Sequence, residues 1–577
     1  MHTLPRFQWT SVPVDSAAAD DLAARFDLSL PVAGVLGARG HCDPVAVARF
    51  LDPRLLHLGD PLAFPGMADA ARRIWQAIED HEPIVVFGDF DADGVTATAL
   101  LTDIILTLGG CVEAFLPDRI TEGYGLTGAA LERCLREHPA RLLVTVDCGI
   151  NSVAEVARAR ASGVDVIVTD HHEPSEQLPA AQVLINPRLG ATPGAEHLCG
   201  AGVAFKLAHA LLKSGRDNGH PAAATCDIRT WLDAVAVATV ADVVPLKGEN
   251  RILVAAGLAA LARRPRMGLK ALVTRAGVIG PLTSHHLAFM LGPRLNAAGR
   301  MRTGWPAVRL LHATEWDAAM GLAVELEALN AERRGVESKL VAEAASQLQG
   351  VPPAGAVVVA GTGWHVGTIG IVAARLTDAW NLPAVVIALD SDGGGRGSVR
   401  GGRGDNVVAA LTACAPLLKG FGGHPRAAGL QLKPGALDEF RRQFAAACAA
   451  QRGSGDSRPE LLVDGWLTPA DIGPGLWQDV QRLEPFGEGH GRPRWGMRGL
   501  RLEGRPQPVG GGGEHLKLSF CAGATTIRGV WFKMGKLADA VTAAGTGPLD
   551  AVFELHENTY GGQSSLEMQV VDLRPAE

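Results

Sequence analysis

Between residues 83 and 187, short apolar runs rich in β-branched residues alternate with longer stretches of helical composition. The runs PIVVFGDFDADG, RLLVTVDCG and VDVIVTDHH are separated by GVTATALLTDIILTLGG and VAEVARARASG. Such alternation is typical of a parallel sheet, because neighbouring parallel strands must be joined by a crossover, usually a helix. The segment therefore predicts an α/β lobe built on a parallel, doubly wound sheet.

The chain of 577 residues is too long for one hydrophobic core and predicts several folding units. We expect the first α/β lobe to be followed by a long connecting helix, a second and smaller α/β lobe, and a C-terminal β-barrel of the OB-fold type. The Ala-, Leu- and Glu-rich stretch at 315–349 indicates the helix, and short strand-like runs with Gly-rich turns indicate the barrel. The expected parts are an N-terminal segment at 1–60, the first lobe at 61–310, the helix at 311–350, the second lobe at 351–455 and the barrel at 460–577.

Composition narrows the class of protein further. Hydrophobic residues make up 47% and charged residues 20%, which argues against disordered, collagen-like or coiled-coil chains. Asp and Glu outnumber Lys and Arg by 61 to 54, so a nucleic-acid partner would require a local basic surface. The nine cysteines include no C-x-x-C pair and predict free thiols in a reducing compartment. We find neither a signal-like N-terminus nor an apolar run that could span a bilayer, and expect a cytoplasmic protein without a membrane partner.

Carboxylates and histidines follow three of the predicted strands. The residues concerned are Asp89, Asp91, Asp93, Asp147, Asp170, His171 and His172. For each Asp taken alone, a helix N-cap or a turn is the favoured interpretation. Together they end three parallel strands, at the edge where α/β sheets bind their ligands. So many like charges at one edge require a cation.

The mixture of carboxylate oxygens and imidazole nitrogens favours Mn²⁺, with Mg²⁺ as the alternative. A further ligand is expected from WLDAVAVATVADVVPL, where we favour Asp242 over Asp233, although either could be an ordinary helix cap. Two ions ~3.5–4 Å apart can bind a bridging hydroxide and stabilise the leaving oxygen of an in-line displacement. The cluster therefore predicts hydrolysis of a phosphoester or phosphoanhydride.

At these residues the chain resembles the DHH phosphoesterase superfamily, and within it the RecJ family of single-strand-specific 5′ to 3′ exonucleases. The motifs that carry the resemblance are, in order, GDFDADG, LPDRITEGYGL, VTVDCG, TDHHEP, INPR, TVADVVPL, GPRLNAAGR, GWHVGTIGIVAARL, GRGSVR, FGGHPRAAG and LEPFGEGHGRPRW. They extend over nearly the whole chain. The resemblance implies a DHH catalytic lobe, a DHHA1-like substrate-binding lobe and an OB-fold domain that binds single strands.

The resemblance also implies roles for individual residues. The ligands of a dinuclear metal site would be Asp89, Asp91, Asp93, Asp147, His171 and Asp242. The catalytic residues would be Asp91, Asp93, His171 and His172. In this scheme His172 is either a neighbouring ligand or a proton donor near the scissile phosphate.

Residues outside the acidic cluster are expected to bind substrate. Arg119 can clamp a phosphate and Tyr124 can stack on a base, although a surface Arg and a packed Tyr are the ordinary alternative. Arg396, Ser398 and Arg400 lie in GGGRGSVRGGRGDN, whose glycines either let the backbone approach a phosphate or form a flexible, solvated loop. By resemblance, Arg119, Ser398 and Arg400 surround a 5′ phosphate.

Four further residues complete the expected substrate site. By resemblance, His365 in GWHVG and His424 in GFGGHPRAAG bind substrate and not metal. Arg294 and Asn296, in GPRLNAAGR, point at the cleft between the lobes or cap a helix.

The C-terminal segment carries the local basic surface that the overall charge conceals. Its basic residues between 488 and 536 are Arg492, Arg494, Arg498, Arg501, Arg505, Lys517, Arg528, Lys533 and Lys536, against Glu488, Glu503 and Glu514. The interleaved aromatic residues are Trp495, Phe520, Trp531 and Phe532. Such interleaving is typical of a single-strand groove with stacking platforms. We expect at least half of these aromatic side chains to fill the barrel core instead.

These features and the resemblance together predict a single-strand-specific exonuclease that releases 5′ mononucleotides, and the resemblance alone implies a role in DNA recombination and repair. The resemblance implies a monomer that receives single-stranded DNA from a RecQ-type helicase and a single-strand-binding protein. Two alternatives stay open. A DHH hydrolase of small substrates would not need the basic segment at 460–577, and a DNA-binding replication scaffold would have lost some of the acidic ligands, which are all present here.

Overall fold

The computed structural model describes residues 4–263, 265–348, 354–402, 404–452, 458–522, 525–560 and 563–576. It divides into two compact units. Unit 1 comprises residues 1–54 and 456–577, and unit 2 comprises residues 55–455. The N-terminal segment is thus grouped with the C-terminal domain, which the sequence did not lead us to expect. Within the described ranges, no helix is long and apolar enough to cross a membrane.

The first lobe of unit 2 is built on five parallel strands in the order β3-β2-β4-β5-β6. They are β2 (Ile84–Phe87), β3 (Val112–Phe115), β4 (Leu142–Val146), β5 (Asp165–Thr169) and β6 (Val183–Ile185). Alternate side chains enter two separate cores, since Ile84 and Val86 pack on one face and Val85 and Phe87 on the other. The strand order reverses between β2 and β4, which is the point where sheets of this topology bind ligands.

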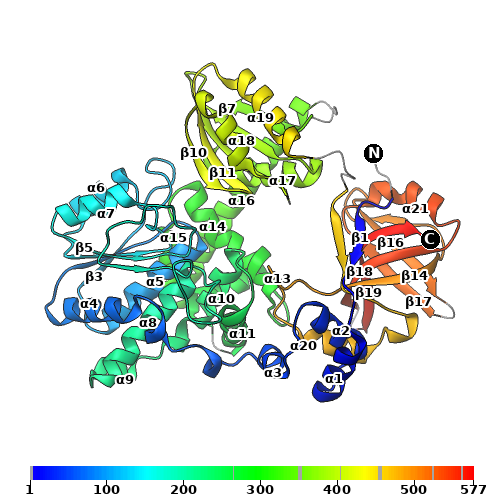
Figure 1. Ribbon diagram of the computed structural model, residues 1–577, viewed down its shortest axis with the longest axis horizontal. Coiled ribbons are helices and arrows are strands. Elements are labelled where there is room, and N and C mark those ends of the chain that lie inside the picture. The colour runs from blue at the N-terminus through cyan, green and yellow to red at the C-terminus, as the bar shows by residue number, and fades with distance from the viewer. Residues whose placement is uncertain are drawn as a thin grey trace. The chain divides into compact units, whose positions relative to one another are not determined.

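Helices cover both faces of this sheet, so the predicted doubly wound arrangement is confirmed (Figure 1). One face carries α6 (Gly128–Glu137) and α7 (Val153–Ala161). The other carries α4 (Met67–Glu79), α5 (Ala92–Thr107) and α8 (Gly200–Asp217). The lobe continues through α9 (Pro221–Thr225), α10 (Leu232–Ala241), α11 (Gly248–Arg263), α12 (Met267–Ala276), α13 (Ser284–His286), a π-helical turn (Leu287–Leu291), α14 (Gly292–Met301) and α15 (Trp305–His312).

The predicted connecting helix is α16 (Trp316–Leu348), a single helix of 33 residues. Glu337 of this helix is buried, and its carboxylate forms an ion pair with Arg333 at 2.9 Å. The same carboxylate pairs with Arg375 of α17 (Val366–Trp380), a helix of the second lobe. This ion-pair network joins the connecting helix to the second lobe.

The second lobe is a mixed sheet in the order β10-β11-β9-β8-β7. Its strands are β7 (Val357–Thr362), β8 (Ala384–Leu389), β9 (Gly395–Arg400), β10 (Leu418–His424) and β11 (Ala427–Leu432). Only β7 and β8 are parallel. Helix α17 packs on one face, and α18 (Val407–Ala413) and α19 (Leu437–Gln451) pack on the other. The Gly-rich stretch around Arg396 is therefore a central strand and not a flexible loop, although Arg403 lies outside the described residues.

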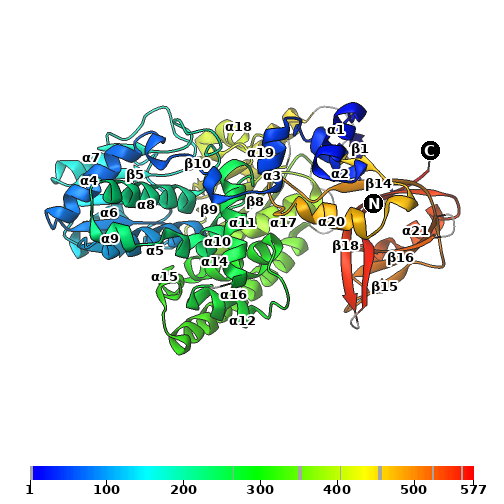
Figure 2. The same ribbon diagram turned by 90° about the horizontal axis from the view of Figure 1, so that it is seen from below.

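Unit 1 contains the predicted OB-type barrel, whose long β18–β19 hairpin can be followed in Figure 2. Its strands are β13 (Gly465–Trp466), β14 (Arg494–Leu502), β15 (Gln507–Val509), β16 (His515–Ala522), β17 (Thr525–Trp531), β18 (Leu549–Tyr560) and β19 (Gln563–Pro575). Five of them close a ring in the order β14-β16-β17-β19-β18. Trp495, Phe520 and Trp531 are buried in the core and Phe532 is 49% exposed, so the expectation that at least half would be core residues is confirmed.

The N-terminal segment packs on this barrel within unit 1. Strand β1 (Gln8–Ser11) pairs in parallel with β12 (Glu460–Val463). The indole of Trp9 donates to Asp572 at 2.8 Å, and Arg39 binds Asp464 through two hydrogen bonds of 2.9 and 3.0 Å. The helices of this unit are α1 (Ser16–Phe26), α2 (Leu30–Ala38), α3 (Pro44–Leu51), α20 (Pro474–Arg482) and α21 (Ala538–Ala544).

Candidate metal centre and phosphate pocket

The three carboxylates of GDFDADG lie between the end of β2 and the start of α5. Asp91 caps α5, because its Oδ1 accepts the N–H groups of Asp93 and Gly94 at 3.0 and 3.1 Å. Asp93 accepts two N–H groups from the first turn of α8, those of Gly200 and Ala201, at 2.6 and 2.8 Å. The ordinary capping role therefore exists, and it fixes both carboxylates at the edge of the sheet.

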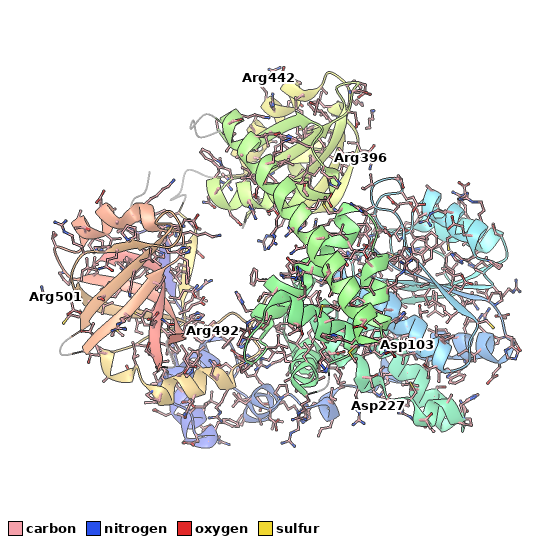
Figure 3. The ribbon with its side chains drawn as sticks, turned by 180° about the vertical axis from the view of Figure 1, so that it is seen from behind. Asp103, Asp227, Arg396, Arg442, Arg492 and Arg501 are labelled. Atoms are coloured by element: carbon pink, nitrogen blue, oxygen red, sulfur yellow. The ribbon has the colours of Figure 1, made fainter. Side chains whose placement is uncertain are left out.

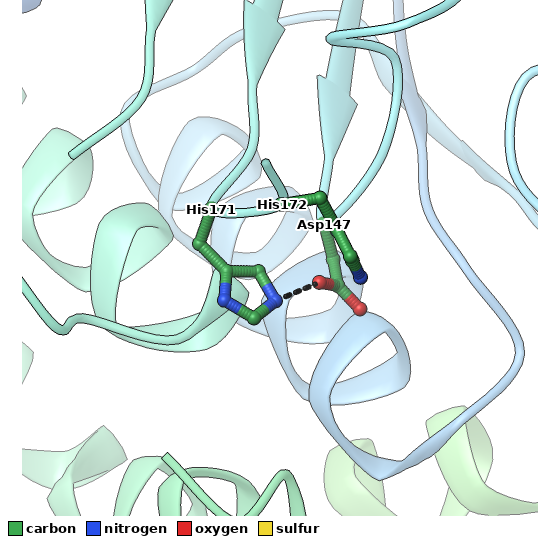
Figure 4. A group of neighbouring side chains, drawn as sticks. All are labelled: Asp147, His171 and His172. Atoms are coloured by element: carbon green, nitrogen blue, oxygen red, sulfur yellow. Dashed lines mark ion pairs between the residues drawn. The ribbon is translucent and has the colours of Figure 1, made fainter. Parts of the chain in front are cut away.

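Several buried polar atoms at this edge have no hydrogen-bond partner. They are both carboxylate oxygens of Asp89, Oδ1 of Asp147, Nε2 of His171 and Oδ2 of Asp242. Nε2 of His171 lies 3.1 Å from Asp147 Oδ1, as drawn in Figure 4, and 3.6 Å from Asp242 Oδ2. Burying such atoms unpaired is costly. Atoms that approach each other without a hydrogen bond are arranged as ligands of a shared cation would be.

The donors fall into groups that fit more than one ion. The groups with ligand atoms within 4.8 Å of one another are Asp89-Asp91-Asp147, Asp93-His171-Asp242 and Asp147-His171-His172. Asp147 and His171 each belong to two groups, as expected for residues between neighbouring ions. The oxygen-rich set with one or two imidazoles suits Mn²⁺ or Mg²⁺. Asp233 instead accepts hydrogen bonds from Ala234 and Arg266, so of the two candidates only Asp242 joins a group.

Electrostatics show how strongly the cluster depends on a cation. Burial and the charge of Asp91 raise the pKa of Asp89 to about 8, and the same causes raise that of Asp93 to about 6. Burial and neighbouring carboxylates raise the pKa of Asp147 and Asp242 well above the usual range. Burial lowers the pKa of His171 to about 3, so its imidazole is neutral, the form that binds metal.

His172 is held from both sides. Its Nδ1 lies 2.7 Å from Asp170 Oδ1, and its Nε2 lies 2.7 Å from the hydroxyl of Tyr124. Asp170 also accepts the N–H groups of Ile150, His171 and His172. Burial lowers the pKa of His172, but the bond to Asp170 and nearby carboxylates outweigh this and raise it. Sequence reasoning placed Asp170 in the motif without this orienting role, and proposed base stacking for Tyr124.

Two backbone features mark the same site. Asp147 and Val243 adopt left-handed conformations with φ of 62° and 60°, which is unusual for a β-branched residue such as Val243. Such strain collects at functional sites. Gly200 touches the cluster as well, since a Cβ there would lie 2.6 Å from Asp147. Only glycine allows α8 to begin so close to the carboxylate.

A cavity of about 770 Å³ lies between the two lobes of unit 2. Its polar lining residues are Arg119, Glu122, Thr127, Arg300, Arg396, Ser398, Arg400, Lys419 and Gln431. Four predicted substrate residues, Arg119, Arg396, Ser398 and Arg400, therefore meet there. Arg300 and Lys419 were missed, although Arg300 ends the motif GPRLNAAGR and Lys419 precedes FGGHPRAAG.

The cavity is built for an anion. Arg400 donates to the hydroxyl of Ser398 at 3.0 Å. Burial and the nearby charge of Arg119 lower the pKa of Arg300 to about 10 and also lower that of Arg400. Glu122 is the one carboxylate among the described lining residues, and it forms an ion pair with Arg133 at 2.6 Å. The first turn of α17 also lines the cavity, which adds the positive end of a helix dipole.

Five other predicted substrate residues lie outside the cavity lining, namely Tyr124, which contacts His172, and Arg294, Asn296, His365 and His424. Arg294 binds Glu327 and the carbonyl of Met290. Asn296 accepts the N–H of Ala92 at 2.7 Å, beside Asp91. His365 caps α17 by accepting the N–H of Gly367 at 3.1 Å, and His424 is exposed at the end of β10.

The basic residues of the barrel separate into two sets. Arg492 and Arg494 pair with Glu484 and Glu554, and Arg498 lies over the ring of Trp466. The second set is Arg501, Arg505, Lys517, Arg528, Lys533 and Lys536, which are all exposed, as are Arg494 and Arg498 of the first set. Figure 3 labels Arg492 and Arg501, one from each set. The half-exposed ring of Phe532 lies 5.2 Å from that of His515.

Comparisons with known proteins match each part of the chain. Family models for the DHH family N-terminal domain, the DHHA1 domain and the RecJ OB domain match residues 83–239, 353–450 and 463–572. A single-stranded-DNA-specific exonuclease RecJ of Bacillus subtilis is 34% identical over 99% of this chain and 71% of its own length. The crystal structure of RecJ from Thermus thermophilus with Mn²⁺ is 31% identical with a TM-score of 0.84, covering 100% of this chain and 80% of that one. The Mg²⁺ complex is 30% identical with a TM-score of 0.77, covering 99% and 79%.

Proposed function

The chain belongs to the RecJ family, and from this membership and the two sites of unit 2 we propose that it is a metal-dependent exonuclease specific for single-stranded DNA. It removes mononucleotides from the 5′ end. The observation that carries the proposal is the meeting, in one unit, of a carboxylate-rich metal centre and a cation-lined cavity. Arg119 links the two, because it lines the cavity and lies close to the carboxylates: burial lowers the pKa of Arg119, and the charges of Asp89 and Asp91 oppose this.

Mn²⁺ or Mg²⁺ would be held by Asp89, Asp91, Asp93, Asp147, His171 and Asp242. When bound, such ions supply an activated water and stabilise the charge of the leaving oxygen. The chain's own contribution is positional. Backbone N–H groups of α5 and α8 fix Asp91 and Asp93, and Asp170 with Tyr124 fixes His172. Burial lowers the pKa of His172, but Asp170 and the nearby carboxylates outweigh this and raise it, which favours an imidazole that can donate a hydrogen bond to the substrate phosphate.

Polarity follows from the cavity in this proposal. Arg119, Ser398 and Arg400 hold the 5′ phosphate, and the adjacent phosphodiester then lies at the metal centre. The exposed basic surface of the barrel supports single-strand binding. We further propose a monomeric, cytoplasmic enzyme of recombination and repair, supplied by a RecQ-type helicase and a single-strand-binding protein. We also propose that the chain is divided into an N-terminal segment at 1–60, a catalytic lobe at 61–310, a connecting helix at 311–350, a substrate-binding lobe at 351–455 and a barrel at 460–577.

The test is hydrolysis of a single-stranded oligonucleotide in the presence of Mn²⁺ or Mg²⁺. A 5′ label should appear early as free mononucleotide, whereas a 3′ label should stay in long products and a blunt duplex should stay intact. Circular single strands, which have no end, should also stay intact. Early release of the 3′ label would contradict the proposed polarity. Cleavage restricted to dinucleotides would point instead to a DHH hydrolase of small substrates.

A further inference from the structure

The cavity between the lobes is much larger than one phosphate requires. Its volume of about 770 Å³ lies within the range of ~300–1,000 Å³ that is usual for sites of whole small ligands. Arg119, Ser398 and Arg400 account for one phosphate, so much of the space serves another part of the ligand.

Three glycines form a bare floor in the remaining part. Gly420 and Gly422 of β10 and Gly429 of β11 line the cavity. A Cβ added at Gly420 or Gly422 would meet nothing within 4 Å, and at Gly429 it would meet only the carbonyl of Gly397 at 4.0 Å. None of the three has a positive φ. Glycine weakens a strand, and neither packing nor backbone conformation requires it here, so we attribute the bare floor to the close approach of a ligand.

Further basic side chains lie along this floor, beyond the residues that would hold the first phosphate. Arg396, Ser398 and Arg400 alternate on β9, so their side chains share one face and follow each other at roughly 7 Å. Arg396 pairs in register with Gln431, which pairs with Gly420, next to Lys419. The guanidinium of Arg396, labelled in Figure 3, donates to the carbonyl of Ile120 at 3.2 Å and so lies beside the Arg119 loop. Arg396 and Lys419 thus form a second group of positive charges, about one two-residue repeat of β9 away from Ser398.

We propose that this second group binds an oligophosphate, so that the enzyme accepts strands whose 5′ end carries a triphosphate. The inference rests on the proposed function and extends its substrate class. Arg119, Ser398 and Arg400 hold the phosphate next to the sugar, and Arg396 and Lys419 hold the outer phosphates over the bare floor. An anionic chain fits because Glu122 is the one carboxylate among the described lining residues and is engaged by Arg133.

Hydrolysis of a strand with a 5′ triphosphate gives a characteristic first product. Water oxygen bonds to the phosphorus between the first and second nucleotides, and the bond from that phosphorus to the 3′ oxygen of the first nucleotide breaks. The departing 3′ oxygen takes a proton. The first turnover therefore releases a nucleoside 5′-triphosphate and leaves a 5′ monophosphate on the shortened strand, and later turnovers release monophosphates only.

The experiment compares two DNA strands of one sequence, with a 5′ monophosphate or a 5′ triphosphate. Wild-type enzyme should degrade both, and the first labelled product of the second strand should be the nucleoside triphosphate. Lys419→Gln should lower the ratio of triphosphate to monophosphate rates by about fivefold or more, because it removes a charged hydrogen bond to an outer phosphate. Gly420→Val should lower the same ratio because its side chain would fill the space above the glycines. Lys433→Gln is the matched control and should keep the wild-type ratio, because Lys433 binds the carbonyl of Pro416 and does not line the cavity.

Two further arms separate the other outcomes. Free nucleoside triphosphate is added to the reaction of the monophosphorylated strand. If it inhibits competitively through Lys419 while the triphosphorylated strand is not cut, the oligophosphate site exists and its ligand is the free nucleotide. If neither ligand binds, the inference is overturned although the exonuclease remains. Failure on the monophosphorylated strand would reject the proposed function itself. The melting temperature of Gly420→Val should be no lower than that of wild type, which excludes misfolding as the cause.

Discussion

The metal centre and the cation-lined cavity are both crowded with like charges, but they are built in different ways. The carboxylates sit at the ends of parallel strands and are fixed by backbone N–H groups, such as those of Gly200 and Ala201 around Asp93. The arginines project from the face of a mixed sheet and from the opposite lobe, with few bonds between them. In the first site the chain's own N–H groups position Asp91 and Asp93, and the second site is assembled from two lobes. We infer that the first determines the chemistry and the second selects the strand end.

The largest effect should come from Asp147, the carboxylate shared by two ligand groups. Asp147→Asn should lower kcat by about 1,000-fold. A metal ion stabilises the transition state by several kcal/mol, and each 1.36 kcal/mol of activation free energy changes the rate about tenfold. Affinity for single-stranded DNA should stay near wild type, because the variant leaves the cavity and barrel intact. Asp233→Asn is the control, as that carboxylate binds Arg266. Equal losses in the two variants would refute the ligand assignment.

Arg400 tests the opposite site. Arg400→Ala should raise KM for a 5′-phosphorylated strand by roughly 10- to 100-fold, as expected for loss of a charged hydrogen bond worth ~1.5–3 kcal/mol, with a smaller change in kcat. The preference for a 5′ phosphate over a 5′ hydroxyl should disappear. Steady-state kinetics on both strands measure this. A fall in kcat with KM unchanged would contradict the inference that the cavity binds the strand end while the metal centre carries out the chemistry.

Tyr124 lies between the two sites. Tyr124→Phe removes the hydroxyl that contacts His172 at 2.7 Å and keeps the ring. We expect kcat to fall about tenfold, the lower end of the range for residues that orient a metal-site histidine, with KM nearly unchanged. If Tyr124 instead stacks on a base, the variant should be close to wild type, because phenylalanine stacks equally well.

The smallest effect concerns the metal-free protein. Asp89 has a pKa of about 8 when folded, against 3.8 for an ordinary aspartate. Between these values the unfolded chain loses the proton and the folded protein keeps it, so stability falls as the pH rises from about 4 to about 8. The melting temperature without metal should drop by a few degrees over this range. Asp89→Asn should reduce the drop, and Mn²⁺ should reverse it. A melting temperature that rises with pH would contradict the assignment.

The metal centre could be predicted from sequence because strand ends of a parallel sheet meet at one edge. Asp89, Asp147 and His171 each follow a strand, so local pattern was enough. Sequence alone left both Asp242 and Asp233 as candidates, since they lie at opposite ends of α10 and only the packing of this helix decides which end faces the sheet. Arg300 and Lys419 were missed because the lobes bring them together across long sequence separations. The role of Tyr124 depends on a side-chain direction that no sequence pattern encodes.

The fold was predictable to the same extent. Alternating strands and helices identified both lobes, and Gly-rich turns identified the barrel. The Gly-rich stretch around Ser398 was left open between loop and phosphate site, since glycine normally interrupts a strand. Its position between β8 and β11 makes it a strand. The pairing of β1 with β12 joins residues 8–11 to residues 460–463, and nothing local to either segment signals it.

That pairing has a consequence for how the protein is made. Residues 1–54 leave the ribosome before unit 2, but their partners, residues 456–577, leave after it. At ~5–20 residues per second, synthesis of the intervening 400 or so residues takes roughly 20–80 s. Through this interval the nascent N-terminus carries apolar side chains, such as Leu22 and Val32, that have no barrel to cover them. Residues 55–455 are thus available to fold as unit 2 before the two segments of unit 1 can come together.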